Sequence, residues 1–549
     1  MKKYILIGVI LLASVLRLYR LGSYPALNAD EAAIGYNAYS LLETGRDEHG
    51  NPWPIHFQSF NDYKPGLYIY LVMPFVKLFG LNEWSVRLPN ALLGVASVYL
   101  LYLFLNKAYD NMNFKFRVRS LSFSPAEIAA FLLAISPWHI HFSRGGWEVN
   151  TATFLILFGI YTFVRGLENI RGLFISVFVF VLSLYAYHSA RIITPMLVFG
   201  LSIMYWTKVQ ANFKSFFITV LLGLILLIPL VIDFTRSDII SRAAGVGLFA
   251  DVGPIERTNE QRMEHSGITG VIMHNKVVNY GLAFLKNWGE HYHGLFLFVS
   301  GDEIQRNRVP ETGEMYLFEI LTILGGLYYL FKNYEENKSS YNLIIYWLII
   351  APIAAALTFQ SPHALRAQNT IIPLTMVSAI GLCAMIRNIS HLKHLIRVSC
   401  YFLLFTILFW NFARYLHMYY KHMSHEYPFS SQYGVKELAG FISDQERSYK
   451  NIVVTQKYDQ PYILFLFYLK YPPAVFQQEH ALTPRDKYGF STVDKFSNFI
   501  FKSIDWDKDK PNFPGSLIIG SDDEIPNEAN IIKRIYGSNN YIYFNVVEN

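Results

Sequence analysis

Residues 215–233 read SFFITVLLGLILLIPLVID, an apolar stretch with one charged side chain, at its end. About 20 such residues in a helix cross the hydrocarbon core of a bilayer. Ten further runs of this kind follow one another along the chain. They lie near 4–19, 86–106, 125–141, 150–164, 172–186, 191–207, 315–331, 342–359, 369–386 and 397–416. We therefore predict an α-helical polytopic membrane protein with about eleven transmembrane helices.

The composition of the chain supports this fold class. Of 549 residues, 52% are hydrophobic and 16% are charged, whereas about 25% are charged in ordinary soluble proteins. The net charge is +6, and the basic residues lie mainly in short loops between apolar runs. Basic residues at such positions orient membrane helices. They do not indicate a nucleic-acid partner. Cys383 and Cys400 both lie within apolar runs. They indicate neither a disulfide framework nor a thiolate metal site.

The orientation of the helices depends on residues 66–79, GLYIYLVMPFVKLF. This apolar stretch is too short to span a bilayer, so we predict a helix that lies at the membrane surface. Eleven spans then place most basic loops, including those with Arg165, Lys208 and Lys332, on the side of the N-terminus. Because positively charged loops remain in the cytoplasm, we expect a plasma-membrane protein with a cytoplasmic N-terminus and an extracytoplasmic C-terminus.

This topology predicts two domains. Residues 1–416 would form the transmembrane domain, with long outer loops at 20–85 and 234–314. Residues 417–549 are less apolar and mix helical with strand patterns, which predicts a small extracytoplasmic α/β domain. In this tail we expect helices at VKELAGFI and DQPYILFLFYLK, and strands at NIVVTQ, AVFQ, SLIIG and YIYFNVV.

An adjacent acidic pair, Asp30 and Glu31, follows the first apolar run within NADEAAIGYNAYSLLETG, residues 28–45. An aspartate at a helix start is commonly a cap, and a glutamate in the first turn favours the helix dipole. At a membrane surface, however, ionisable side chains tend to be functional, since their burial is costly. Glu148, within SPWHIHFSRGGWEVN (136–150), is a second candidate carboxylate, although it also fits an ordinary first-turn acid.

Two short outer loops each carry a histidine followed three residues later by an arginine: His188 with Arg191, and His363 with Arg366. A single arginine at the end of a span usually anchors the helix at headgroup level. On the outer side, where arginine is disfavoured, a phosphate ligand would explain both, because guanidinium offers phosphate a planar fork. Lys64, which opens the predicted surface helix, is a further candidate for a lipid phosphate or a snorkelling lysine.

The histidines give no metal signature. His139 and His141 are two residues apart and do not share a helix face, and the acids and histidines of residues 234–314 follow no regular ligand spacing. We therefore assign no metal-binding residues.

Together these motifs resemble the protein O-mannosyltransferase-like branch of the GT-C glycosyltransferases and the related aminoarabinose transferases that modify lipid A. The resemblance covers about the first 200 residues well and the later spans by pattern. It implies a polyprenyl-phosphate sugar donor, an active site at the outer membrane surface and an inverting displacement at the anomeric carbon. The stretches that carry it are residues 28–45, DEHGNPWP (47–54), YKPGLYIYL (63–71), FGLNEWSVRLPNALLG (79–94) and residues 136–150.

By this resemblance the essential carboxylate maps onto Asp30 and Glu31, and a second acid maps onto Glu148. The aminoarabinose branch has a glutamate before its Lys-Pro, where this chain has Tyr63, so the need for a divalent metal stays open. Independently of the resemblance, an acceptor hydroxyl needs a positioned base, which we assign to Asp30. The departing lipid phosphate needs cationic partners. The candidates are Arg191, Arg366, Lys64 and His188.

The predicted reaction moves a sugar from a polyprenyl-phosphate donor to a hydroxyl or phosphate on a protein, lipid or glycan. An O-antigen ligase or glycan polymerase is the alternative, and it would use outer-loop arginines and histidine without an acidic pair after the first span. A transporter would show charged or broken helices at mid-membrane. This chain keeps its charges near the ends of its apolar runs.

Overall fold

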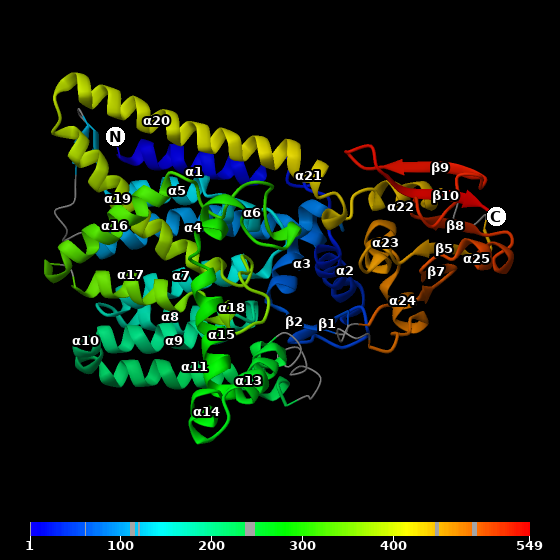
Figure 1. Ribbon diagram of the computed structural model, residues 1–549, viewed down its shortest axis with the longest axis horizontal. Coiled ribbons are helices and arrows are strands. Elements are labelled where there is room, and N and C mark those ends of the chain that lie inside the picture. Colours follow the sequence, from blue (N-terminus) through cyan, green and yellow to red (C-terminus); the bar gives the residue numbers. More distant parts are fainter. Residues whose placement is uncertain are drawn as a thin grey trace. The chain divides into compact units, whose positions relative to one another are not determined.

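The computed structural model describes residues 2–60, 62–109, 116–118, 121–235, 247–336, 338–444, 449–485 and 491–549 (Figure 1). Contacts divide the chain into two compact units. Unit 1 contains Met1–Tyr19 and Asn90–Leu416, and unit 2 contains Arg20–Pro89 and His417–Asn549. The predicted outer loop 20–85 thus falls in the same unit as the predicted tail domain 417–549.

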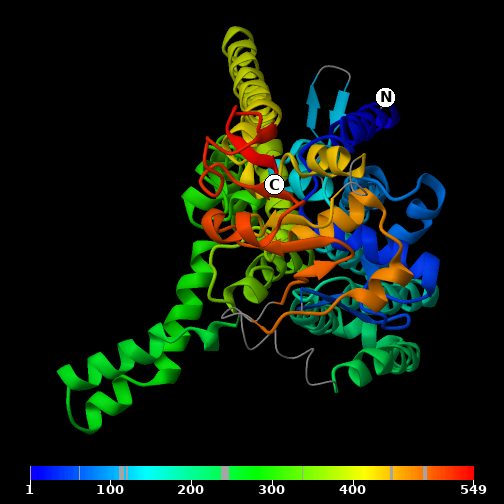
Figure 2. The same cartoon turned by 90° about the vertical axis from the view of Figure 1, so that its right-hand side faces the viewer.

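In its described residues, unit 1 is almost entirely helical, and β3 (Phe116–Val118) pairs antiparallel with β4 (Leu121–Phe123). Figure 2 shows the green helices α13, α14 and α15 projecting from its other helices. Helix α4 (Glu83–Tyr109) begins in unit 2 and continues into unit 1 from Asn90. The other main helices of unit 1 are α1 (Lys2–Leu18), α5 (Pro125–Ile135), α6 (Pro137–Ser143), α7 (Glu148–Gly166), α8 (Ile170–Ala186), α9 (Ala190–Met204), α10 (Trp206–Ala211), α11 (Phe213–Asp233), α13 (Gly253–Glu264), α14 (Ile268–Met273), α15 (Lys276–Glu290), α16 (Glu319–Lys332), α17 (Lys338–Ile350), α18 (Ile353–Ala356), α19 (Ile371–Ser390) and α20 (His394–His417).

Among the described residues, five helical stretches are long and apolar enough to cross a membrane: Glu83–Lys107, Glu148–Gly166, Phe213–Asp233, Gln368–Ser390 and His394–Glu426. Shorter apolar helices lie between them, so the chain is a multi-pass membrane protein. Two predicted spans are each divided by a proline. Pro137 begins α6 directly after α5, and Pro352 separates α17 from α18, because proline supplies no N–H to a continuing helix.

Small residues let the helices of unit 1 approach closely. A Cβ at Gly381 of α19 would lie 1.7 Å from the carbonyl oxygen of Thr322 on α16, and one at Gly326 would lie 2.0 Å from that of Val377. Across the same interface, the hydroxyls of Thr322 and Ser378 are 2.7 Å apart. Close backbone packing with hydroxyl pairs is typical of helices within a membrane.

Unit 2 is built on a six-stranded sheet in the order β6-β7-β5-β8-β10-β9, in which β5 is parallel to β7 and β8 and the other pairs are antiparallel. The predicted strands NIVVTQ, SLIIG and YIYFNVV are confirmed as β5, β8 and β10. The strand predicted at AVFQ is wrong, because Pro473 occupies the first position of helix α24, where proline is favoured. The strands are β5 (Ile452–Thr455), β6 (Lys495–Phe496), β7 (Phe499–Lys502), β8 (Leu517–Gly520), β9 (Ile531–Tyr536) and β10 (Ile542–Glu548).

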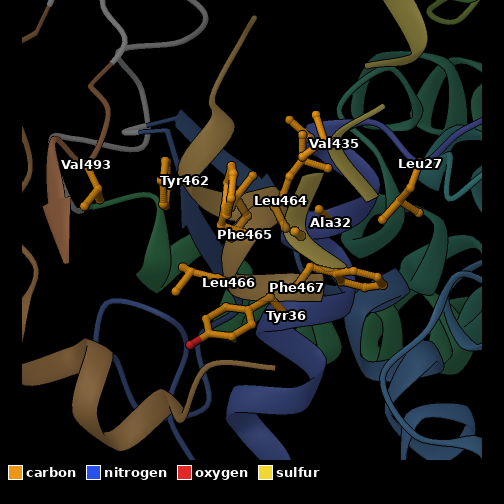
Figure 3. Packing of buried hydrophobic residues seen from close by; sticks show 14 of the residues in the cluster. Leu27, Ala32, Tyr36, Val435, Tyr462, Leu464, Phe465, Leu466, Phe467 and Val493 are labelled. Carbon is orange, nitrogen blue, oxygen red and sulfur yellow. The ribbon is translucent and has the colours of Figure 1, made fainter. Parts of the chain in front are cut away.

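The core of unit 2 joins this sheet to helices from both ends of the chain. Ala32 and Tyr36 of α2 pack with Leu464 and Phe467 of α23 (Figure 3). A Cβ at Gly35 would lie 2.6 Å from the ring of Phe467, so α2 lies directly on α23. The other elements are α2 (Ala29–Thr44), α3 (Leu67–Phe79), α22 (Val435–Ser443), α23 (Pro461–Leu469), α24 (Pro473–Glu479), α25 (Trp506–Asn512) and the hairpin of β1 (His56–Ser59) and β2 (Asp62–Pro65).

Candidate active site

The acidic pair lies in the first turn of α2, and the cap of this helix is Asn28. Its side chain accepts the N–H of Glu31 at 3.0 Å, while the carboxylate of Glu31 accepts the N–H of Asn28 at 3.4 Å. This reciprocal arrangement is a capping box. The ordinary role expected for Asp30, that of the cap, therefore belongs to another residue.

Asp30 forms an ion pair with Lys64. Lys64 lies on β2, opposite Phe57 of β1, and its ammonium is 5.3 Å from the centre of the Phe60 ring. The Asp30 side chain is 24% exposed and that of Lys64 is 12% exposed. Unit 2 thus brings two of the predicted site residues together, a carboxylate that solvent reaches and a cation held by a short hairpin.

Glu31 faces the interior of the same unit. Its two oxygens each accept a hydrogen bond at 2.7 Å from the guanidinium of Arg87, and both side chains are almost fully buried. Arg87 also donates to the carbonyls of Leu21 and Pro25. The bidentate pair fixes the chain that enters α2. Sequence reasoning missed Arg87, although a charge inside the apolar run 86–106 was a signal that a partner exists.

The DEHG stretch supplies a third carboxylate, Glu48, which is fully buried. Neither of its oxygens has a hydrogen-bond partner among the described residues, and the same is true of Nε2 of His49. These two groups face each other, with Nε2 of His49 3.5 Å from Oε1 of Glu48. Burial raises the pKa of Glu48 to about 8, with a further contribution from Asp47.

The hydrogen bonds of His480 determine which nitrogen of His49 carries a proton. Nδ1 of His480 is 2.8 Å from the carbonyl oxygen of Phe476, and a carbonyl only accepts, so Nδ1 carries the hydrogen. In the neutral ring, Nε2 of His480 then accepts from Nδ1 of His49 at 2.9 Å. This leaves a lone pair on Nε2 of His49, facing Glu48. Burial lowers the pKa of His49 to about 3, and His480 adds to this effect, so the neutral carboxyl of Glu48 is the available proton donor.

Unit 1 contains the remaining candidates. Glu148 is the first residue of α7 and is half-buried. The guanidinium of Arg191 approaches Nδ1 of His188 at 2.8 Å, donates to the carbonyl of Leu184 at 3.1 Å and lies 4.8 Å from the ring centre of Phe234. The structure therefore brings His188 and Arg191 together, as a cation held at the start of α9.

The second His-x-x-Arg loop is arranged differently. Arg366 donates to the hydroxyl of Thr358 at 2.9 Å, whereas Nδ1 of His363 is 3.6 Å from the carboxylate of Asp302. Asp302 also accepts the backbone N–H of Ala364 at 2.7 Å. The backbone N–H of Ala364 thus fastens this loop to Asp302, with the His363 ring nearby, while the arginine is held through Thr358.

Both carboxylates at the start of α2 are paired with cationic side chains. Asp30 is paired with Lys64 and Glu31 with Arg87. Across the described residues, no group of three His, Cys, Asp or Glu side chains is arranged to hold a metal ion.

The multi-pass helical unit and the sheet-bearing unit that contains α2 together have the fold of the GT-C glycosyltransferases, so the predicted resemblance is confirmed for the fold. ArnT from Cupriavidus metallidurans is similar in the apo state (TM-score 0.56) and bound to undecaprenyl phosphate (TM-score 0.54). Each comparison has 12% sequence identity and covers 98% of this chain and 97% of ArnT. The archaeal oligosaccharyltransferase AglB from Archaeoglobus fulgidus, in complex with an inhibitory peptide and a dolichol-phosphate, matches with a TM-score of 0.50 and 14% identity over 85% of this chain and 64% of AglB.

Sequence comparison gives one short match. The chain is 28% identical to Putative mannosyltransferase YycA of Bacillus subtilis (strain 168) over 106 residues, which are 19% of this chain and 14% of YycA. No family model matches the sequence. At these identities the solved structures establish the fold of the chain alone.

Proposed function

We propose that the protein is an inverting glycosyltransferase that moves a sugar from a polyprenyl-phosphate donor to an acceptor hydroxyl or phosphate on a protein, lipid or glycan. The observation that carries this proposal is the pair of Asp30 and Lys64, a partly exposed carboxylate beside a cation. The fold supports it, because two proteins of similar fold were solved with undecaprenyl phosphate and with a dolichol-phosphate.

In the proposed reaction, Asp30 takes the proton of the acceptor hydroxyl while the hydroxyl oxygen attacks the anomeric carbon. The bond between that carbon and the phosphate oxygen breaks, and the lipid phosphate leaves with the electron pair. Lys64 stabilises the negative charge that develops on the phosphate. Arg191, Arg366 and His188 belong to unit 1, and for them we propose donor-phosphate binding on the pattern of their His-x-x-Arg loops.

Two carboxylates have supporting roles in this proposal. Glu31 positions the start of α2 through its bidentate bonds to Arg87. Glu148, at the positive end of the α7 dipole, is the proposed second acid and would contact the acceptor or the sugar.

We also propose eleven spans with a cytoplasmic N-terminus, and an extracytoplasmic face that carries residues 20–85, 234–314 and the α/β part 417–549. Helix α3 supports this topology. It has 13 residues, too few to cross a bilayer. Tyr68 and Val72 are buried in the core of unit 2 while Leu78 and Phe79 are exposed, as expected of a helix that rests on the membrane surface.

Reconstituted protein tests the function directly. Proteoliposomes given a polyprenyl-phosphate-linked radiolabelled sugar and an extract of candidate acceptors should release free polyprenyl phosphate and label one acceptor. In this assay Arg366→Ala should raise the donor concentration needed for half-maximal rate, and Arg366→Lys should recover part of the loss, since lysine supplies a point charge without the fork. Uptake of labelled donor without release of polyprenyl phosphate would instead identify a transporter.

A further inference from the structure

Two histidines meet where the last long apolar helix ends. Helix α20 (His394–His417) runs into a π-helical turn, η6 (Met418–His422), and then into the short helix α21 (Met423–Glu426). The N–H of Met423 bonds to the carbonyl of Met418, five residues earlier. In an α-helix, residues five apart point about 140° away from each other. The π turn instead places His417 and His422 on one face, and such turns are frequent at functional sites.

The opposite face of this turn is anchored within unit 2. Met418 and Tyr419 are buried, and the ring of Tyr24 packs against those of Tyr419 and Tyr420, with centres 5.6 and 5.4 Å apart. The hydroxyl of Tyr24 also donates to the carbonyl of Tyr419. The irregular turn is therefore held by aromatic packing, which presents its histidine face to solvent.

The two rings are oriented so that their Nε2 atoms point toward one shared position. Their Nε2 atoms are 3.2 Å apart and their ring centres are 5.0 Å apart. With metal–nitrogen bonds of about 2.05 Å, this nitrogen separation corresponds to an angle of about 100° at the metal, and the ring centres would then be about 5 Å apart. A linear N–H···N hydrogen bond of the same length would place the ring centres about 5.5 Å apart.

A carboxylate sets the tautomer of one ring. Oε1 of Glu426 is 3.0 Å from Nδ1 of His422, one helical turn earlier. A carboxylate accepts the Nδ1 hydrogen and leaves the lone pair on Nε2, facing His417. Carboxylate–histidine pairs of this kind orient metal-ligating histidines and increase their basicity.

We propose that His417 and His422 bind a divalent transition-metal ion of borderline softness, such as Zn²⁺, Ni²⁺ or Cu²⁺, through their Nε2 atoms, with Glu426 orienting His422. Imidazole nitrogen suits these ions. Two protein ligands leave coordination positions for water or for an oxyanion. This proposal does not depend on the proposed glycosyl transfer.

The test uses the full chain without a polyhistidine tag, purified in detergent and stripped of metal with a chelator. Calorimetric titration with Zn²⁺ should show one site that is weakened at least about tenfold in His417→Gln and in His422→Gln, and about 10- to 100-fold in Glu426→Gln. With Cu²⁺, the electron paramagnetic resonance spectrum should show two equivalent nitrogens, and one in either histidine variant.

His425→Gln is the matched control, because His425 is an exposed histidine of the same segment and should leave the affinity unchanged. All three other substitutions are at exposed or half-buried positions, so the thermal unfolding of the metal-free variants should match that of the parent. The proposal fails if the parent binds no Zn²⁺ at millimolar concentration, or if the affinity is the same in parent, His417→Gln and His422→Gln.

Discussion

Replacing Glu48 by glutamine should stabilise the protein at alkaline pH, although the side chain is fully buried. In the parent the neutral carboxyl of Glu48 faces the unprotonated Nε2 of His49 at 3.5 Å. Glutamine keeps the shape and offers an N–H to the same nitrogen, but it has no proton to lose. The substitution therefore isolates the cost of ionising Glu48 in the folded state.

The sign and size of the effect follow from the pKa of Glu48, which rises from 4.5 to about 8 on folding because of burial and the neighbouring Asp47. A carboxyl with a raised folded-state pKa contributes stability that is complete below pH 4.5 and is lost as the pH rises through about 8. Between pH 5 and pH 8 the linkage relation gives a loss of about 3 kcal/mol for the parent. The Glu48→Gln variant should not show this loss.

Thermal unfolding of both proteins in detergent, followed by intrinsic fluorescence at pH 5, 6.5 and 8, measures the effect. The two Tm values should agree within a few degrees at pH 5, and that of the variant should be the higher one at pH 8. The pKa of His49 is lowered on folding, so the stability that the neutral ring contributes is lost as the pH falls below about 6.5. This contribution of His49 is the same in the parent and in the variant. A Tm difference that does not change with pH, or that favours the parent at pH 8, would refute this reasoning.

Three further outcomes are expected. Asp30→Asn should reduce turnover by about 100- to 10,000-fold, the contribution of a positioned base. Glu43 is an exposed acid on the same helix, and Glu43→Gln should leave turnover unchanged. Near-parental turnover in a well-folded Asp30→Asn protein would exclude Asp30 as the base. Arg87→Met should lower the free energy of unfolding by about 3–5 kcal/mol, because it leaves a buried carboxylate without its cation, and an unchanged Tm would contradict the role of that pair. The topology can be tested in a chain with both native cysteines replaced by serine. In intact cells, Glu528→Cys should react with an added impermeant maleimide, and Lys208→Cys should not. The reverse labelling would overturn the proposed topology.

The membrane fold was predictable from the sequence because each span depends on local hydrophobicity. Helix α11 nearly coincides with the apolar run 215–233. Where a predicted span divides into two helices, as at Pro137, the proline in the sequence also indicated the break. Asn28 and Glu31 have the spacing of a capping box. The cap of α2 could therefore have been identified from the sequence, although Asp30 was the residue considered for that role.

The partners of the site residues were not predictable, because they are distant in the sequence. Lys64 is 34 residues from Asp30, and His480 is 431 residues from His49. Periodicity identifies the element that carries a residue, but it does not show which elements pack together. The place of residues 20–89 in the same unit as the tail depends on such long-range packing, as does the π turn that joins His417 to His422.

Adjacent acids on a helix point about 100° apart, and this separation gives Asp30 and Glu31 different chemistry. Glu31 points inward to a guanidinium that binds both of its oxygens and is itself buried. Accepting a proton there would break a bidentate buried pair, which is costly. Asp30 points to a lysine, a point charge without a fork, and its side chain remains 24% exposed. Since a base must reach its substrate and change protonation state without disrupting the fold, Asp30 is the carboxylate suited to react, and Glu31 is the one that holds it in place.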